Sequence, residues 1–329
     1  MLMTRKNLLL SLGICTILIL GMAVFAVNPA MAVENPEEGF AIGFSQMESN
    51  MPFRVAENES LLALEDEYPG VEVYLTDAQG SVAKQISDAE DLLARGVDVL
   101  VIAPREYEGF QSVWDAAKRA GVPVILIDRE AAGIPGEDFE TFIGADFWME
   151  GRQAGVYLSA KMEGEGKIIE LTGTSGASVA RDRQGGFEEV IGYFPEMEII
   201  ASQTADFTRM EGLNVMENLI QRYGSEIDAV YAHNDEMALG AIEALESSDL
   251  DPADIWIASI DGTTAAQEAI IDGKLDVSVE CSPFFGPIVY ETAKSILRGE
   301  DVPTSITMTD ATIYTPENVA EYYNPDAIY

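Results

Sequence analysis

Two short apolar runs decide the fold of this chain: Val-Asp-Val-Leu-Val-Ile-Ala at residues 97–103 and Val-Pro-Val-Ile-Leu-Ile-Asp-Arg at residues 122–129. A helical pattern precedes each run. The first helix is predicted over residues 82–95, and the second ends at Gly121. Strands that are almost wholly apolar and alternate with helices are typical of a parallel sheet covered on both faces. The sequence therefore predicts an α/β protein of the doubly wound class.

The same alternation extends in both directions along the chain. Before residue 82, strands are predicted over 39–44 and 71–75 with a helix over 55–68 between them. In the second half, strands are predicted over 167–171, 198–202, 229–232 and 256–260, and helices over 180–191, 212–222 and 237–245.

The two halves also resemble each other. In each half a helix, a turn and a strand are followed by a second strand that ends in aspartate, at Asp128 and at Asp261. One explanation is that all α/β units look alike; the other is that the chain forms two lobes of like topology. Ligands bind beyond the carboxyl ends of parallel strands. Two lobes whose sheets faced each other would therefore direct both aspartates into one shared cleft.

The N-terminus has the pattern of a secretory signal. Arg5 and Lys6 precede an apolar stretch over 8–27, and Ala30-Met31-Ala32 matches a cleavage site. We predict that residues 1–32 are removed and that the protein is exported. The alternatives are a retained membrane anchor, because about 20 apolar residues can span a bilayer, and a lipoprotein that uses Cys15.

The chain is strongly acidic, with 57 Asp and Glu against 19 Lys and Arg and a formal net charge of −38. Cleavage after residue 32 would remove two positive charges and no negative ones. Binding of nucleic acid depends on Lys and Arg contacts to phosphate, so this composition excludes a nucleic-acid partner. An acidic surface repels itself, and salt screens that repulsion. The composition is typical of a saline or alkaline exterior.

We expect the mature protein to refold in higher yield and to melt at a higher temperature in ~2 M salt than without salt, because salt screens the repulsion between surface carboxylates. Thermal melts and refolding yields in the two buffers measure this. Equal values would contradict the saline-habitat hypothesis.

The sequence offers few groups for catalysis. His233 is the only histidine, and Cys281 is the only cysteine after residue 32. The chain contains no G-x-S-x-G, H-E-x-x-H, C-x-x-C, EF-hand or phosphate-loop motif. We therefore predict no catalytic residue, no metal site and no cofactor, so that the protein is not an enzyme. The enzymatic alternatives are a glycosidase, since carboxylates are abundant, and a sugar isomerase.

Polar residues instead gather at the ends of apolar strands, as Asp128-Arg129, Asn234-Asp235 and Asp261. A buried polar group there needs a partner or a ligand. Carboxylate and guanidinium groups bind sugar hydroxyls, and aromatic rings such as Phe53 and Phe207 can cover a sugar's apolar face. The alternatives are a structural Asp128–Arg129 ion pair and rings that pack in the core.

Several segments together resemble the ribose- and galactofuranose-type periplasmic sugar-binding proteins of ABC transporters, and the likeness runs from about residue 40 to 314. They are Ile-Gly-Phe-Ser-Gln at 42–46, Ile-Leu-Ile-Asp-Arg at 125–129, Gly-Thr-Ser-Gly-Ala-Ser-Val-Ala-Arg-Asp-Arg-Gln-Gly-Gly-Phe at 173–187, Ala-Asp-Phe-Thr-Arg at 205–209, Tyr-Ala-His-Asn-Asp-Glu-Met-Ala-Leu-Gly-Ala at 231–241 and Ser-Ile-Asp-Gly at 259–262.

The resemblance implies the type I periplasmic-binding-protein fold: two Rossmann-like lobes with parallel sheets, three hinge crossings and a closing cleft. The crossings are expected near Ala145, Cys281 and Thr309. The N-terminal lobe would then hold residues 39–144 and 282–309, and the C-terminal lobe residues 145–281 and 310–329.

The resemblance also implies the roles of single residues. Phe53 and Phe207 would sandwich the sugar ring. The implied polar contacts come from Arg54, Asp128 and Arg129 in the first lobe and from Arg183, Asn234 and Asp261 in the second.

Ribose binders have Phe at the position of Arg54 and Asn at that of Met51, so these departures favour a galactofuranose-like or other furanose or pentose ligand. Glu280 is a further candidate in place of a ligand-contacting Gln, and strand alternation turns His233 away from the cleft.

The expected function is that of a monomeric solute-binding protein, which closes around a monosaccharide and delivers it to a membrane permease. The alternative is a sugar receptor for a chemotaxis or kinase signalling system. A sugar-responsive repressor shares this fold but needs a DNA-binding headpiece, where this chain has a signal-like segment.

Overall fold

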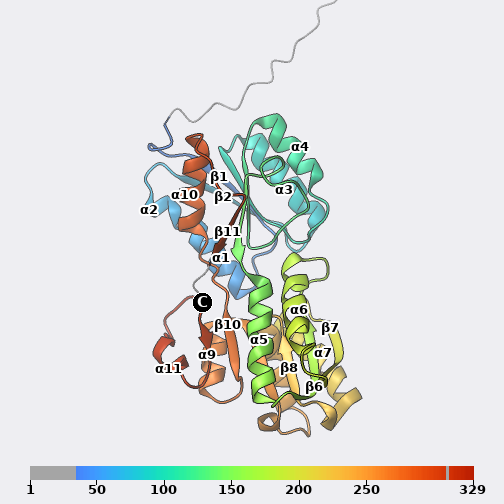
Figure 1. Ribbon diagram of the computed structural model, residues 1–329. Helices are drawn as coiled ribbons and strands as arrows, with labels where there is room; N and C mark the ends of the chain where they lie inside the picture. The colour runs from blue at the N-terminus through green and yellow to red at the C-terminus, as the bar shows by residue number, and fades with distance from the viewer. Residues whose placement is uncertain (1–34, 309–310) are drawn as a thin grey trace, which may run out of the picture.

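The computed structural model describes residues 35–308 and 311–329 and shows two α/β lobes, one above the other in Figure 1. The predicted signal segment at 1–32 and the predicted crossing at Thr309 lie outside the described residues. Each lobe is built on its own six-stranded sheet. Within the described residues, no helix is both long enough and apolar enough to span a membrane.

The first sheet is wholly parallel and has the order β11-β5-β4-β3-β1-β2. Its strands are β1 (Ala41–Gln46), β2 (Glu72–Asp77), β3 (Val99–Ala103), β4 (Val124–Ile127), β5 (Thr141–Ala145) and β11 (Ser305–Met308). Every residue of β3 and β4 is buried, as their uninterrupted apolar runs predict.

The second sheet has the order β12-β10-β9-β8-β6-β7. Its strands are β6 (Glu165–Thr172), β7 (Glu196–Thr204), β8 (Ala229–Ala232), β9 (Trp256–Asp261), β10 (Val277–Glu280) and β12 (Ile313–Tyr314). The pairs within this sheet are parallel, as predicted, except at one edge, where the two-residue β12 runs antiparallel to β10. After its third passage the chain enters this lobe at the carboxyl ends of the parallel strands and forms β12 at once, without a helix before it, so β12 runs in the opposite direction.

Helices cover both sheets (Figure 1). The first lobe carries α1 (Pro52–Leu62), α2 (Leu64–Glu67), α3 (Val82–Arg95), α4 (Gln111–Ala120) and α10 (Gly286–Leu297). The second carries α5 (Phe147–Lys161), α6 (Ser178–Ile191), α7 (Arg209–Tyr223), α8 (Asp235–Glu246), α9 (Thr264–Ile271) and α11 (Val319–Tyr322).

The two ends of α3 show how the local sequence determines where a helix begins and ends. The Ser81 hydroxyl accepts a hydrogen bond from the backbone N–H of Lys84 at 3.3 Å, which satisfies one of the free donors of the first turn. Gly96 ends the helix with a φ of 89°, a left-handed conformation that a residue without a Cβ adopts at little cost. The helix occupies the predicted residues 82–95.

The sheet order makes the chain pass between the lobes three times. It leaves the first sheet after β5, returns to the first lobe between β10 and α10, and leaves again between β11 and β12. The second passage is anchored by the Ser60 hydroxyl, which accepts from the N–H of Gly286 at 2.8 Å. The third includes residues 309–310, which are not described.

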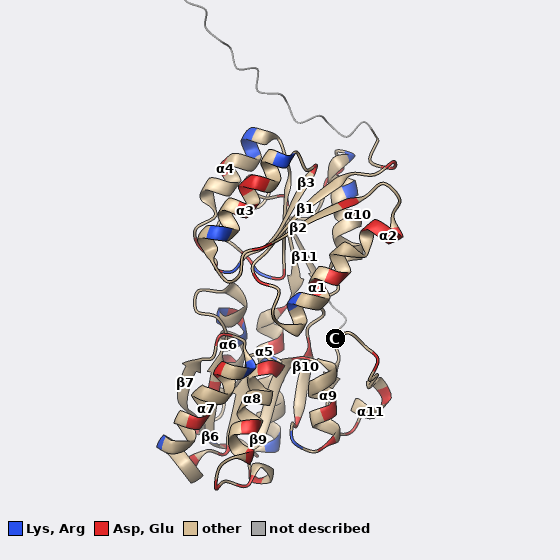
Figure 2. Ribbon diagram, turned by 180° about the vertical axis from the view of Figure 1, so that it is seen from behind, with Lys and Arg blue, Asp and Glu red and all other residues tan. Residues whose placement is uncertain are grey.

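Acidic residues are spread over the helices and loops of both lobes (Figure 2). The few basic residues are mostly engaged with them, as in the ion pairs of Lys84 with Asp88 and of Lys118 with Asp138, both at 2.6 Å. Exposed pairs of this kind contribute little stability and are weakened by salt. The excess negative charge is therefore a property of the surface.

Candidate functional site

A cavity lies between the lobes, and all eight residues predicted for the site line it. Its other lining residues are Met51, Pro52, Val179, Glu236 and Thr263. The carboxyl ends of both sheets face this space, which is where α/β proteins bind ligands.

Backbone strain is concentrated in the same place. Asp128 and Phe207 each have a φ of 59°, and Asp261 has a φ of 128°. Non-glycine residues held in such conformations cost about 1–3 kcal/mol each and cluster at binding and active sites. At the end of β4 and of β9, this turn of the backbone aims the aspartate at the cavity.

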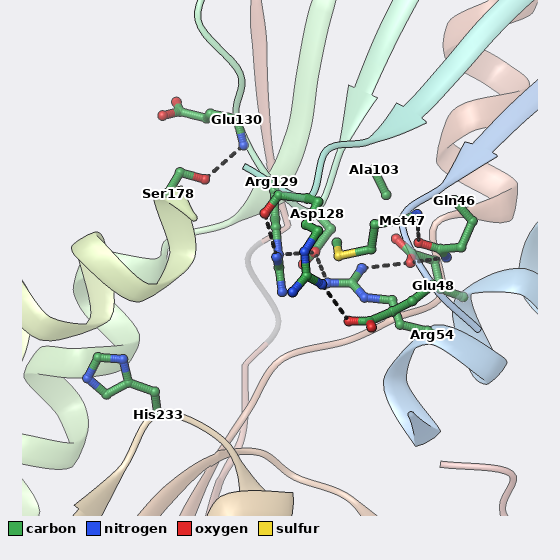
Figure 3. A network of polar contacts seen from close by, with 12 residues as sticks. Gln46, Met47, Glu48, Arg54, Ala103, Asp128, Arg129, Glu130, Ser178 and His233 are labelled. Atoms are coloured by element: carbon green, nitrogen blue, oxygen red, sulfur yellow. Dashed lines mark hydrogen bonds and ion pairs between the residues drawn. The ribbon is translucent and has the colours of Figure 1, made fainter. Parts of the chain in front are cut away.

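In the first lobe, Arg54 lies between two buried carboxylates. Its guanidinium donates to Glu57 at 2.8 Å and to Asp128 at 2.5 Å (Figure 3). Burial alone would lower the pKa of Arg54, but the carboxylates of Asp128 and Glu57 outweigh it and raise that pKa. Arg54 is therefore a fixed cation on the first turn of α1, next to Phe53.

The positive charge of Arg129 is neutralised much less well by nearby carboxylates than that of Arg54. Its Nε lies 3.6 Å from Asp128 Oδ2 and makes no hydrogen bond, while one terminal N–H donates to the backbone oxygen of Arg105 at 2.9 Å. Burial, together with the positive charge of Arg54, lowers the pKa of Arg129 to about 9. It stays protonated at neutral pH and has N–H groups free for an oxygen-rich ligand.

In the second lobe, Arg183 on α6 joins two carboxylates. It donates to Glu150 at 2.9 Å and to Asp261 at 3.2 Å, and a further N–H donates to the backbone oxygen of His233. The pKa of Asp261 is raised by burial, although the charge of Arg183 opposes this. The pKa of Glu150 is raised in the same way.

Two glycines bring α5 and α6 close enough for this arrangement. A Cβ on Gly151 would lie 2.1 Å from the backbone oxygen of Arg183, and one on Gly186 would lie 2.0 Å from that of Trp148. The helices therefore touch backbone to backbone. This contact places Glu150 beside Arg183.

The two predicted stacking rings border the cavity from opposite lobes. Phe53 lies under the Arg54 guanidinium at 4.9 Å, and Phe207 lies 5.2 Å from that of Arg129. Asn234 supports the second ring, since its amide donates to the backbone oxygen of Phe207 at 3.0 Å and its oxygen caps α8 by accepting from Met237. Much of the hydrogen-bonding capacity predicted for a ligand is thus used within the protein.

Neither the further candidate Glu280 nor His233, which was expected to point away from the cleft, lines the cavity. Glu280 accepts from the backbone N–H of Thr312 at 2.9 Å, at the β12 edge of the sheet. His233 is fully buried with its Nε2 3.2 Å from Glu170, and burial lowers its pKa. Its ring points away from the network around Arg54 and Arg129 (Figure 3), as strand alternation predicts.

The lobes touch each other beside the cavity, so the structure is closed. The N–H of Tyr107 donates to the backbone oxygen of Gly176 at 2.9 Å, and that of Glu130 donates to the Ser178 hydroxyl at 2.9 Å (Figure 3). The first contact joins a loop of each lobe, and the second joins a loop of the first lobe to the first residue of α6. Such contacts stabilise the closed form.

Sequence reasoning missed the two carboxylates that hold the arginines, Glu57 and Glu150. Glu57 had a local signal, because it lies three positions after Arg54 on one helix, a spacing that makes side chains neighbours. Glu150 had none, since it is separated from Arg183 by 33 residues and belongs to a different helix.

Comparison with known proteins gives a consistent match. Residues 42–301 match the family model described as periplasmic binding protein domain. The galactofuranose-binding protein YtfQ of Escherichia coli (strain K12) is 36% identical over 308 residues, 92% of this chain and 96% of that protein. The ribose import binding protein RbsB of Bacillus subtilis (strain 168) is 38% identical over 268 residues, 81% of this chain and 85% of that protein.

A solved structure agrees with this match. The periplasmic binding protein component of the arabinose ABC transporter from Shewanella sp. ANA-3, bound to alpha and beta-L-arabinofuranose, has a TM-score of 0.82 and 36% identity. The alignment covers 86% of this chain and 94% of that one. The chain belongs to the periplasmic binding protein family and has its type I fold, with two mainly parallel α/β lobes.

Proposed function

We propose that this protein captures a monosaccharide, in furanose form, in the cavity between its lobes and delivers it to the permease of an ABC transporter. The observation that carries the proposal is the convergence of Phe53, Phe207 and three buried arginines on one cavity. Rings from opposite lobes suit the two faces of a small sugar, and the arginine N–H groups suit its hydroxyls. The names of the relatives point to furanoses and ribose.

The charges around the cavity favour a neutral ligand. Arg54 is already paired with Asp128 and Glu57, and Arg183 with Asp261 and Glu150. Arg129 is a third cation at the cavity, so three arginines stand against four carboxylates, and an anionic sugar would add to the excess of negative charge. A neutral ligand with several hydroxyls needs no such compensation, and a Kd of about 1 µM corresponds to roughly −8 kcal/mol.

The mechanism follows from contacts to both lobes. An open and a closed form interconvert about hinges near residues 145, 281 and 309, and the ligand binds tightly only when Phe53 and Phe207 approach each other. Ligand therefore shifts the population toward the closed form. The permease recognises that form, and no covalent step is involved. The protein acts as a monomer in the periplasm, after cleavage near Ala32.

A thermal-shift screen in high salt tests the assignment. The sugars are galactose (including a galactofuranoside), arabinose, ribose, xylose and glucose, together with sugar alcohols. At one hundred times its Kd a ligand stabilises the folded state by about 2.7 kcal/mol, so the cognate sugar should raise the melting temperature by several degrees. Galacturonate and ribose 5-phosphate serve as anionic controls and should produce no shift. The absence of a shift with every neutral sugar would contradict the proposal.

Uptake measurements separate transport from sensing. In a strain that lacks the gene, uptake of the labelled cognate sugar should fall. Unchanged uptake with a lost chemotactic or transcriptional response to that sugar would instead support the receptor function.

A further inference from the structure

His233 is the only histidine of the sequence, and its buried ring does not line the cavity. The residue directly follows β8 and contacts residues that do line it. Its backbone oxygen accepts from Arg183, and the next residue, Asn234, donates an amide N–H to the backbone oxygen of Phe207 at 3.0 Å. The side chain of His233 is therefore placed where it can affect the cavity without touching a ligand.

Each ring nitrogen of His233 makes one polar contact. Nε2 lies 3.2 Å from Glu170 Oε1, and Nδ1 accepts from the backbone N–H of Gly173 at 3.4 Å. Burial lowers the pKa of the imidazole, although the bond to Glu170 opposes this, so the ring is neutral at neutral pH and carries one N–H. Because Nδ1 faces a donor, the proton is on Nε2. The bond to Glu170 thus selects the tautomer that can accept from Gly173.

Glu170, on β6, is held on its other side as well. It is fully buried, and its Oε2 accepts from the Ser202 hydroxyl on β7 and from the Gln184 amide on α6. These bonds fix the carboxylate beside the imidazole. The ring of Tyr231 packs against the imidazole at a centroid distance of 5.1 Å. His233 is therefore held in the orientation that faces Gly173.

Gly173 lies directly against the ring of Phe207. A Cβ at this position would lie 2.0 Å from Cζ of that ring, so a side chain here would displace the ring. The backbone oxygen of Gly173 accepts at 2.8 Å from the hydroxyl of Thr204, three residues before Phe207. Phe207 has a φ of 59°, a conformation that persists only when the surrounding structure holds it. Gly173 is part of that surrounding structure.

We propose that Glu170 and His233 are positioning residues for the ligand site: Glu170 fixes the imidazole, the imidazole holds the backbone of Gly173, and Gly173 sets the position of the Phe207 ring. The inference deepens the proposed function and rests on it, since Phe207 covers one face of the bound sugar there. Contacts between two surfaces weaken steeply when a small gap opens between them. A displaced Phe207 therefore weakens binding even though His233 makes no contact with the sugar.

The test replaces His233 by two residues that each keep one half of the imidazole. In His233→Asn the side-chain oxygen takes the position of Nδ1 and can accept from Gly173, but no donor reaches Glu170. In His233→Gln the amide N–H reaches Glu170, but no atom takes the position of Nδ1. We expect His233→Gln to bind sugar about three- to tenfold more weakly than the wild type, the effect of one lost hydrogen bond. His233→Asn should restore most of this affinity.

Stability should follow the opposite order. A hydrogen bond to a carboxylate contributes more than one between neutral groups, so His233→Asn should melt at a lower temperature than His233→Gln. Titration calorimetry with the neutral sugar that gives the largest shift in the thermal screen measures affinity, and melting curves of the ligand-free proteins measure stability.

Tyr223→Phe is the matched control. It removes a hydrogen bond of 3.0 Å to the backbone oxygen of Ile200 in the same lobe, and Tyr223 does not line the cavity. This variant should melt at a lower temperature than the wild type but bind sugar equally well, which shows that a lost hydrogen bond in this lobe does not by itself weaken binding.

Two results would overturn the inference while the proposed function stands: wild-type affinity in His233→Gln, or affinities that fall in the same order as the melting temperatures, which indicates a purely structural role. NMR of the labelled imidazole nitrogens in the ligand-free wild type should find the proton on Nε2, and a proton on Nδ1 would also overturn the inference. A wild-type protein that binds none of the sugars would contradict the proposed function and, with it, this inference.

Discussion

The Arg183→Ala variant is expected to melt at a lower temperature than the wild type and to bind sugar roughly a hundredfold more weakly, a change of about 2.7 kcal/mol in binding free energy. Arg183 is the cation between Glu150 and Asp261, and all three side chains are buried. Removal of one partner from a buried ion pair costs about 3–5 kcal/mol of stability, because the remaining charges are uncompensated.

The pH dependence of this variant provides a sharper check. Burial already raises the pKa of Glu150 and of Asp261, and the charge of Arg183 opposes that rise. Without Arg183 both pKa values rise further, so the folded variant holds protons that the unfolded chain releases near pH 4. The folded state then loses stability as the pH increases above about 4. The loss of stability of this variant relative to the wild type should therefore be smaller at acidic pH.

Two controls separate stability from binding. Arg183→Met combined with Glu150→Gln removes opposite charges together and should regain much of the stability but not the sugar affinity. Arg152→Ala removes an arginine of α5 from a half-exposed ion pair with Glu189, and such pairs contribute little. If Arg183→Ala melted and bound sugar like the wild type, Arg183 would be neither a structural nor a binding residue.

Arg129→Ala and Asp261→Ala are each expected to weaken sugar binding at least tenfold while the fold stays intact. A hydrogen bond to a charged group contributes about 1.5–3 kcal/mol, and about 1.4 kcal/mol corresponds to a factor of ten. Arg129 has few partners within the protein, as its lowered pKa of about 9 reflects, so its removal leaves little unpaired. Without Asp261, Arg183 keeps Glu150 and the backbone oxygen of His233.

Calorimetry on the purified variants measures the affinity, and melting curves report the fold. Arg119→Ala, at an exposed position on α4, serves as the control for loss of a positive charge. Wild-type affinity in Arg129→Ala or in Asp261→Ala would remove that residue from the site.

Much of the fold could be predicted from local patterns, since burial on both faces demands apolar runs. The helix over 82–95 and the strand over 229–232 were located to the residue. The elements beside the crossings were not predicted: β11 is only partly buried and reads Ser-Ile-Thr-Met, which carries no strong strand signal. Its place at the edge of the first sheet depends on pairing with β5, far away in the sequence.

Some residues of the candidate site could likewise be predicted from local sequence, and others could not. Asp128 and Asp261 were predicted because a polar residue that ends a buried apolar strand is visible in the sequence alone. Arg54 and Arg183 were carried over from the family resemblance. The partners Glu57 and Glu150 could not be selected from 57 acidic residues by composition.

The sequence by itself determined the alternation of apolar strands with helices and which strand ends carry polar side chains, because both depend on residues adjacent along the chain. Only the tertiary structure decided which carboxylate holds which arginine, that β12 runs antiparallel to β10, and that the Glu280 side chain bonds to the backbone of Thr312. These features depend on how distant segments approach one another. Distance in space between residues far apart in sequence is set by packing and chain crossings, which leave no local pattern.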